Sequence, residues 1–231
     1  MRGAAFTLAE VLITLGIIGV VAALTLPTLI SNYKNQVYVN KLKKMVSLLE
    51  NGIRKAAADE DTDVKNSEFY KLFNAYSCES ANVCDDRVEA ISKYFKVLGS
   101  DTNNYKKNKI HGGEKSVLGN IILADGSAII SEPWEFDSTI AIDINADKKP
   151  NTYGRDYFEV RVDTGGLIHD ADDCNIQEVA YSYDGNYDNG GIMYVYEVTS
   201  CGLCKDKLAN NPDYDGCYLY RIQSNGWKMD Y

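Results

Sequence analysis

The segment AAFTLAEVLITLGIIGVVAALTLPTLI, residues 4–30, is almost entirely apolar and contains one acidic residue, Glu10. A helix over residues 6–30 would be about 37 Å long at about 1.5 Å per residue. That length is enough to span a hydrocarbon core of roughly 30 Å with some tilt. A carboxylate in hydrocarbon is strongly unfavourable unless it is paired. The sequence therefore predicts a membrane-spanning helix whose single acid needs a partner.

Residues 1–5, MRGAA, precede this segment and carry Arg2 as their one charge. A cleaved secretory signal has a basic region first and small residues after its apolar core. Here the small residues come before the apolar core, so an ordinary secretory signal is not predicted.

Phe6, Thr7, Leu8 and Glu10 form a Phe-Thr-Leu-x-Glu pattern. It resembles the prepilin signature of type IV pilins and of the pseudopilins of type II secretion. The resemblance implies that a prepilin peptidase cuts between Ala5 and Phe6, although the family usually has glycine before the cut, and that Phe6 is then methylated. It also implies that Glu10 pairs with the N-terminal amine of its own or a neighbouring subunit in a filament. The alternative for Glu10 is an interfacial side chain that reaches the lipid headgroups.

Three further residues of the apolar segment bear on assembly. Gly16 and Gly19 permit close approach of neighbouring helices, as in a bundle of anchors, although glycine is also ordinary in membrane helices. Pro27 removes one backbone donor and is expected to loosen the helix, at a place where the family commonly has proline.

Two signals disagree about orientation. Only Arg2 precedes the apolar segment, whereas four lysines follow it: Lys34, Lys41, Lys43 and Lys44. Such a count of basic residues predicts that the rest of the chain lies in the cytoplasm. The cysteines and the prepilin signature instead predict an extracytoplasmic domain. We follow the second pair of signals, which gives a single-pass protein of the bacterial inner membrane.

Apolar residues three to five positions apart continue the helix over residues 31–58 as an amphipathic segment. They are Val37, Leu42, Met45, Leu49, Ile53 and Ala56. The remaining residues, 59–231, are predicted to form one globular domain. Helices are predicted over 67–76, capped by Ser67, and over 85–98, followed by a polar loop over 101–115.

The rest of the chain reads as strands and hairpins. Residues 117–131 are predicted to turn at Asp125-Gly126 and residues 157–169 at Gly165-Gly166. Further strands are predicted over 138–144, 191–198, 217–222 and 227–231, the last two joined by Asn225-Gly226. Helices first and hairpins later predict an α+β fold with an antiparallel sheet packed on the long helix, which is the pilin architecture that the N-terminal resemblance implies.

The six cysteines all follow the apolar segment, which favours disulfides in an oxidising compartment. Six thiols allow 15 connectivities. Short spacing favours the pairs Cys78–Cys84 and Cys201–Cys204, which leaves Cys174–Cys217. Zinc binding by CGLC is disfavoured, since no second CxxC and no nearby histidine completes a tetrahedral set.

Asp143, Asn145 and Asp147 alternate like the first three ligands of a calcium loop, and Asn151 and Asp156 could close it. An EF-hand would need glycine where Lys148 stands and a glutamate where Gly154 stands. The segment also resembles a Pro-Asn-x-x-Gly-x-Asp-x-Phe block of pseudopilin-like proteins, some of which bind calcium in a loop. The alternative is an Asx-rich turn between two strands.

The formal charge of −9 argues against nucleic acid as a partner. No phosphate loop, nucleophile elbow or histidine-based metal motif indicates an enzyme. The sequence thus predicts a structural subunit, a pseudopilin or minor pilin, with other subunits, prepilin peptidase and an inner-membrane assembly platform as partners. The alternatives are a membrane-anchored binding module or adhesin that does not polymerise, and a thiol oxidoreductase using CGLC.

Overall fold

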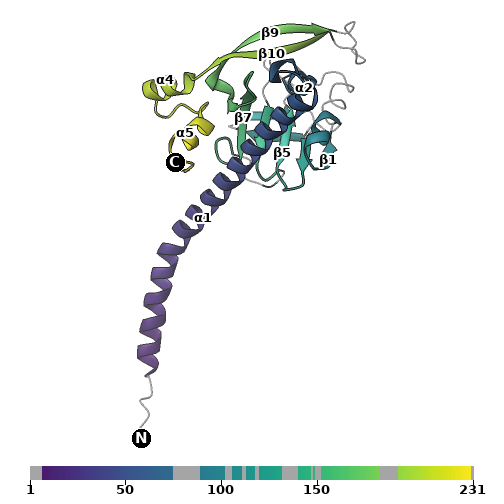
Figure 1. Cartoon of the computed structure of the whole chain (residues 1–231). Helices are drawn as coiled ribbons and strands as arrows, with labels where there is room; N and C mark the ends of the chain where they lie inside the picture. The colour runs from purple at the N-terminus through teal and green to yellow at the C-terminus, as the bar shows by residue number, and fades with distance from the viewer. Residues whose placement is uncertain are drawn as a thin grey trace. The chain divides into compact units, whose positions relative to one another are not determined.

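The computed structural model describes residues 7–74, 89–101, 106–110, 113–117, 120–131, 140–146, 148, 152–182 and 192–229 (Figure 1). Two compact units make up the chain, Met1–Val37 and Tyr38–Tyr231. One helix, α1 (Leu8–Asp59), begins in the first unit and ends in the second.

In the first unit, the large apolar side chains of α1 from Leu8 to Ile30 are exposed, from 44% at Val11 to 79% at Leu8. By its length and composition this helix could cross a membrane, and a signal sequence near an N-terminus has the same properties. Pro27 lies inside α1, and the helix continues beyond it. The predicted apolar helix is therefore present.

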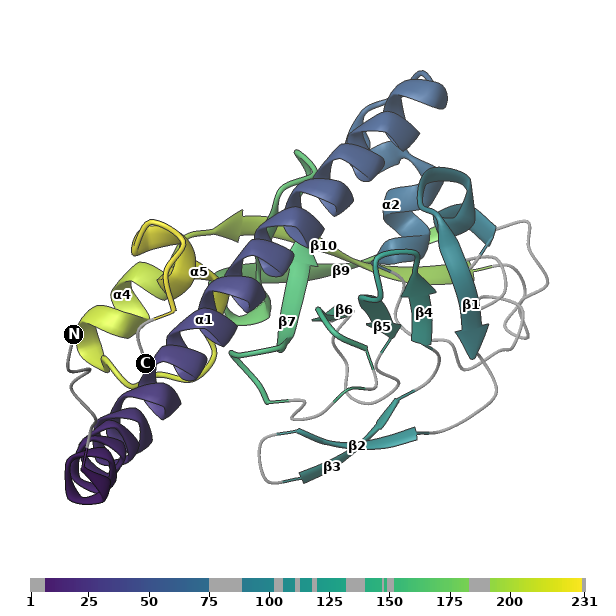
Figure 2. The ribbon, with the colours of Figure 1, turned by 90° about the horizontal axis from the view of Figure 1, so that it is seen from below.

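In the second unit, α1 buries the predicted apolar stripe. Leu42, Met45, Leu49, Ile53 and Ala56 are fully buried. They share one hydrophobic core with side chains of the sheet, such as Ile142 and Val160. Figure 2 shows this half of α1 lying across the strands, which confirms the prediction that the long helix packs on an antiparallel sheet.

The main sheet has six antiparallel strands in the order β1-β4-β5-β6-β7-β8. Their bounds are β1 Val97–Asp101, β4 Asn120–Leu123, β5 Ala128–Ser131, β6 Ile140–Asp143, β7 Tyr157–Val162 and β8 Ile168–Asp170. The predicted turns at Asp125-Gly126 and Gly165-Gly166 join β4 to β5 and β7 to β8. Gly126 and Gly166 both have positive φ, as tight hairpin turns require.

Short helical segments connect α1 to this sheet. They are η1 (Val64–Asn66), α2 (Glu68–Phe73) and a helix whose described residues are 89–94. The hydroxyl of Ser67 accepts a hydrogen bond from the amide of Tyr70, so the predicted cap of α2 is confirmed. The predicted helix over 85–98 ends earlier than expected, because β1 begins at Val97.

Two ribbons of two strands lie outside the main sheet. One pairs β9 (Cys174–Ser182) with β10 (Ile192–Cys201), and the other pairs β2 (Lys106–Ile110) with β3 (Gly113–Val117). The second ribbon corrects the prediction of a polar loop over 101–115. A hairpin outside the main sheet needs no apolar face, so its sequence lacks the alternation that indicates a half-buried strand.

The C-terminal strands predicted over 217–222 and 227–231 are wrong. The chain forms α4 (Leu203–Asn210) and α5 (Tyr218–Ser224), and residues 225–229 lie outside any strand. Leu219 and Ile222, three positions apart, are both fully buried. The spacing of these two residues places them on one face of a helix, whereas the alternation in Tyr-Leu-Tyr favours a strand over only three residues. The chain forms the helix.

Candidate functional site

The first turn of α1 holds Glu10 in a reciprocal pair with Thr7. The amide and the hydroxyl of Thr7 both donate to Glu10 Oε2, at 2.9 and 2.8 Å. The amide of Glu10 donates in return to Thr7 Oγ1, at 3.3 Å. This is a capping box, which satisfies amides that a helix start otherwise leaves unpaired. The acid that the sequence singles out thus has a partner within its own chain.

The structure says less about the other residues predicted for processing and assembly. Ala5 and Phe6 lie outside the described residues. Apart from the adjoining backbone of α1 itself, no heavy atom of the described chain lies within 4 Å of the place where a Cβ of Gly16 or Gly19 would be. Both positions are therefore open to the close approach of another helix.

The three described candidate ligands of the calcium segment are buried. Asp143, Asn145 and Asp156 are 1%, 6% and 0% exposed. Asp143 Oδ1 accepts from the amide of Asn145 at 2.9 Å, as in an Asx turn. Asp156 accepts from the side chain of Asn145 and from the amide of Thr152. These bonds fit the alternative of an Asx-rich turn.

One atom of this segment fits a cation instead. Among the described residues, the buried Asn145 Oδ1 has no hydrogen-bond partner. A buried amide oxygen without a donor is costly, and such an oxygen is a normal calcium ligand. Asp147 and Asn151, the other two predicted ligands, lie outside the described residues. Asp143, Asn145 and Asp156 are thus the described residues that would hold calcium.

The disulfide pattern corrects two of the predicted pairs. The structure joins Cys174 to Cys201 and Cys204 to Cys217, in place of Cys174–Cys217 and Cys201–Cys204. Cys174 and Cys201 are direct partners in the β9–β10 ladder, which brings their Cα atoms to 4.1 Å. Strand pairing therefore outweighs closeness in sequence. The predicted pair Cys78–Cys84 lies outside the described residues.

CGLC also occupies a different setting from the one the sequence predicts. It follows β10, as expected, but leads directly into α4 and not into a polar loop. Its two cysteines belong to separate bridges, so they do not form a Cys201–Cys204 redox pair. The strand before the motif is also antiparallel to its neighbour, unlike the βαβ setting of a thioredoxin-type site.

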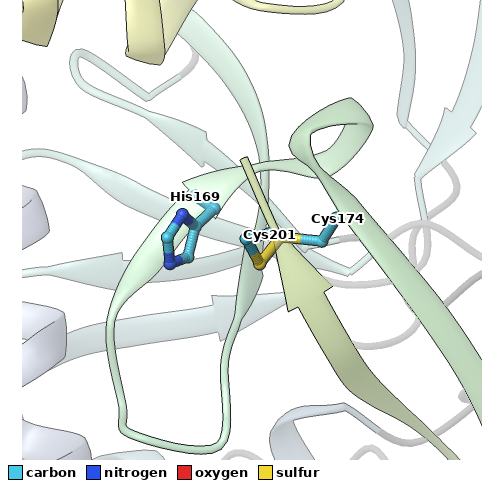
Figure 3. Close-up of side chains that lie close together, drawn as sticks. All are labelled: His169, Cys174 and Cys201. Atoms are coloured by element: carbon cyan, nitrogen blue, oxygen red, sulfur yellow. A yellow bond between two sulfur atoms is a disulfide. The ribbon is translucent and has the colours of Figure 1, made fainter. Parts of the chain in front are cut away.

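His169 lies beside the Cys174–Cys201 bridge (Figure 3). One of its ring nitrogens and the two sulfur atoms all lie within 4.8 Å of one another. Its two nitrogens also contact carboxylates, Nε2 with Asp163 at 3.2 Å and Nδ1 with Asp173 at 3.3 Å. Sequence reasoning missed this cluster, because it joins the β7–β8 hairpin of the main sheet to a bridge of the separate β9–β10 ribbon.

The two carboxylates hold His169 in its charged form. Burial alone would lower the pKa of His169, but hydrogen bonds and charge from Asp163 and Asp173 outweigh it and raise the pKa to about 9. Burial opposes ionisation of both acids as well, yet His169 and nearby backbone amides lower the pKa of each. At neutral pH the cluster is an imidazolium between two carboxylates.

Two buried ionisable residues close to this cluster in the sequence, Arg161 in β7 and Asp170 in β8, make hydrogen bonds through their side chains. Arg161, 5% exposed, donates through Nη1 to the carbonyl oxygens of Ala171 and Cys174. Asp170, 2% exposed, accepts from the amides of Leu219 and Tyr220, at 2.9 and 2.6 Å, and so caps α5. Burial raises the pKa of Asp170 to about 7, although these two amides oppose the shift.

No family model, no curated protein and no solved structure matches this chain. Its class is therefore defined by its own fold. It is an α+β protein with a long apolar N-terminal helix, an antiparallel sheet packed against that helix, and two disulfides among the described cysteines.

Proposed function

We propose that this protein is a prepilin-like structural subunit, a pseudopilin or minor pilin, of an extracytoplasmic filament. The observation that supports this best is the Thr7–Glu10 pair at the start of an apolar helix. A capping box alone would serve any helix. Combined with a membrane-length apolar segment, it holds a carboxylate at the point where processing would create a new amino terminus.

In this proposal, prepilin peptidase removes residues 1–5 and leaves Phe6 with a free amine, which is then methylated. The amine lies one residue before Thr7, so it can compete with the Thr7 donors for the Glu10 carboxylate. The carboxylate already accepts charge-assisted hydrogen bonds from Thr7, but a protonated amine adds the attraction of an opposite charge, which is strong in an apolar environment. An amine would therefore be favoured over the hydroxyl. When subunits stack, a neighbour's amine at this position stabilises the carboxylate and sets the register of the helices.

The disulfides support the orientation in this proposal. Disulfides persist in oxidising compartments and are rare in the cytosol. The two described bridges therefore support an extracytoplasmic position for residues 38–231, in the bacterial periplasm or outside the cell. The partners in this proposal are further copies or homologous subunits and an inner-membrane assembly platform, and the subunit has no catalytic role.

Substitution of Glu10 tests the proposal. Glu10→Ala and Glu10→Gln are expected to be processed and inserted normally but to be lost from filaments, measured by immunoblotting of sheared filament fractions. Thr25→Val is the matched control, because the Thr25 hydroxyl only donates to a carbonyl of its own helix, that of Val21. A non-polymerising binding module or adhesin would instead keep its surface activity in both Glu10 variants. Wild-type incorporation of Glu10→Ala, or a mature chain that retains residues 1–5, would refute the filament role.

A second function, calcium binding in the 143–156 loop, is favoured by the partnerless Asn145 Oδ1. Bound calcium would supply positive charge to this oxygen and to two buried carboxylates, and would stiffen the loop between β6 and β7. Titration calorimetry of the whole chain in detergent with up to about 1 mM Ca²⁺ is expected to give heat that Asn145→Ala abolishes. Asp213→Asn, on an exposed turn, is the control. Absence of heat from the wild type would leave the Asx turn as the whole role of this segment.

A further inference from the structure

We infer that the Cys174–Cys201 bridge is a thiol-exchange site, at which an extracytoplasmic dithiol attacks Cys201 and releases Cys174 as the leaving thiolate. The inference rests on the extracytoplasmic position given in the proposed function, but it does not require filament assembly. It rests on the exposure of the two bridges, on the side chains around Cys174, and on the position of the bridge in the β9–β10 ribbon.

The two described disulfides differ in access. Cys204 and Cys217 are both fully buried, whereas Cys174 is 6% exposed and Cys201 is partly exposed. Cys201 is followed by the exposed Gly202, whose φ of +123° turns the chain from β10 into α4. Exchange requires a thiolate to reach a sulfur atom. An external thiol can therefore reach Cys201, and it cannot reach the second bridge without local unfolding.

The charges around Cys174 favour its departure as an anion. The ring of His169 lies within 4.8 Å of the sulfur atoms (Figure 3). The guanidinium of Arg161 donates to the carbonyl oxygen of Cys174 at 3.4 Å. Neighbouring cations stabilise a thiolate and make it a better leaving group.

The acids that face this region do not cancel the effect. Asp163 and Asp173 both contact the imidazole of His169 and keep it protonated. Asp173 also accepts from the amide of Cys204 at 2.7 Å, and Asp170 accepts from the amides of α5. From α1, Glu50 accepts from the amide of Ile168. These carboxylates thus accept hydrogen bonds from donors of their own, while the charged ring of His169 lies within 4.8 Å of the two sulfur atoms.

The exchange proceeds in two balanced steps. The reagent thiolate attacks Cys201 Sγ, so that a mixed disulfide forms and the Sγ–Sγ bond to Cys174 breaks, with the electron pair going to Cys174. The second thiol of the reagent loses its proton to the solvent and attacks the reagent sulfur of the mixed disulfide. Cys201 then leaves as a thiolate and takes up that proton from the solvent, while Cys174 remains a thiolate. Two electrons pass to the protein, and the dithiol becomes a disulfide.

Opening this bridge would change the ribbon selectively. Cys174 and Cys201 form the last pair of the β9–β10 ladder, where the chain enters the ribbon from η2 (Ala171–Asp173) and leaves it for α4. The bridge closes a segment with a sequence separation of 27. Its loss frees the base of the ribbon, while Cys204–Cys217 still holds α4 to α5.

The first experiment needs no variant. The whole chain in detergent micelles is treated with limiting dithiothreitol, quenched with iodoacetamide at intervals, and analysed by peptide mass spectrometry. We expect Cys174 and Cys201 to be alkylated at least about ten times faster than Cys204 and Cys217. Equal rates, or faster opening of Cys204–Cys217, would overturn the inference.

Two variants test the role of His169. His169→Gln removes the cation and is expected to slow the opening of Cys174–Cys201 severalfold at pH 7, whereas His169→Lys keeps a cation and most of the rate. The Cys204–Cys217 bridge serves as an internal control, since a loosened fold would speed its opening. A rate unchanged in His169→Gln would show that the imidazolium does not assist the departure of Cys174.

The thiols themselves give an independent readout. In Cys201→Ser, the pH dependence of iodoacetamide alkylation is expected to show a Cys174 thiol with a pKa below the ordinary value of about 8.5. In Cys174→Ser, the Cys201 thiol is expected to have the higher pKa of the two. The reverse order of the two pKa values would make Cys201 the better leaving group, which would overturn the proposed attack on Cys201.

Discussion

Gly52 of α1 lies directly against the ring of Phe95. A Cβ at residue 52 would sit 2.2 Å from Cζ of that ring, which is far inside van der Waals contact. Phe95 is 4% exposed and packs within the core that joins α1 to the sheet. The contact explains why glycine stands at this buried position of the helix.

Gly52→Ala is therefore expected to destabilise the second unit. Alanine favours a helix over glycine by about 1 kcal/mol, but the collision with a buried ring costs about 1–3 kcal/mol in forced rearrangement. The net loss should appear in the free energy of unfolding measured by denaturant titration. The double variant Gly52→Ala/Phe95→Leu frees space for the new methyl group and should recover part of the loss. A single variant more stable than wild type would show that the ring moves aside freely.

Thr7 gives a prediction at the other end of α1. Thr7→Val removes the hydroxyl that caps Glu10 while it keeps the shape of the side chain. The loss of an N-cap costs about 1 kcal/mol, so the first turn of α1 should fray. Amide hydrogen exchange of residues 8–11 in micelles should become faster. Thr14→Val is the control, because the Thr14 hydroxyl only donates to the carbonyl of Val11, and equal exchange in both variants would contradict a capping role.

The sequence predicts α1 and the two tight turns because each is set by local rules. The apolar spacing from Leu42 to Ala56 has one helical period, and Asp125-Gly126 permits only a few backbone conformations. The role of Thr7 as a helix cap can also be predicted from the sequence, since Thr-x-x-Glu before an apolar run is a capping box pattern. Local rules decide such features without knowledge of the rest of the fold.

The disulfides and the His169 cluster could not be predicted in the same way. Cys174 faces Cys201 only because β9 and β10 pair in one register, and nothing near either residue specifies that register. His169 meets Asp163 across the β7–β8 turn and Asp173 beyond the end of β8. The sequence predicts a strand where α5 forms, because the alternation of Tyr-Leu-Tyr competes with the helical spacing of Leu219 and Ile222. The start of α5 is also stabilised by Asp170, about fifty positions away in sequence, and no local pattern indicates that cap.

The cap of α5 can be tested through Asp170. Asp170→Ala leaves the buried amides of Leu219 and Tyr220 without an acceptor, and each lost partner costs about 1–3 kcal/mol. Asp170→Asn keeps one acceptor oxygen in a neutral side chain of the same shape. Since burial raises the pKa of Asp170, a neutral side chain is well tolerated there, and the asparagine variant should lose much less stability than the alanine variant. Thermal unfolding of both variants measures the difference, and equal losses would contradict the capping role.

The pH dependence of stability should carry the signature of His169. Its pKa is raised from 6.5 in the unfolded chain to about 9 in the folded protein, because Asp163 and Asp173 bind the charged form. Its contribution is therefore fully present below pH 6.5 and is lost as the pH rises through 9. A tenfold change in proton affinity corresponds to about 1.4 kcal/mol, and solvent screening of the partly exposed ring reduces the total to about 1–3 kcal/mol. The free energy of unfolding should thus fall between pH 7 and pH 10 more steeply in the wild type than in His169→Gln, measured by denaturant titration across that range. Other groups titrate equally in both proteins, so identical slopes would show that the two carboxylates do not stabilise the imidazolium.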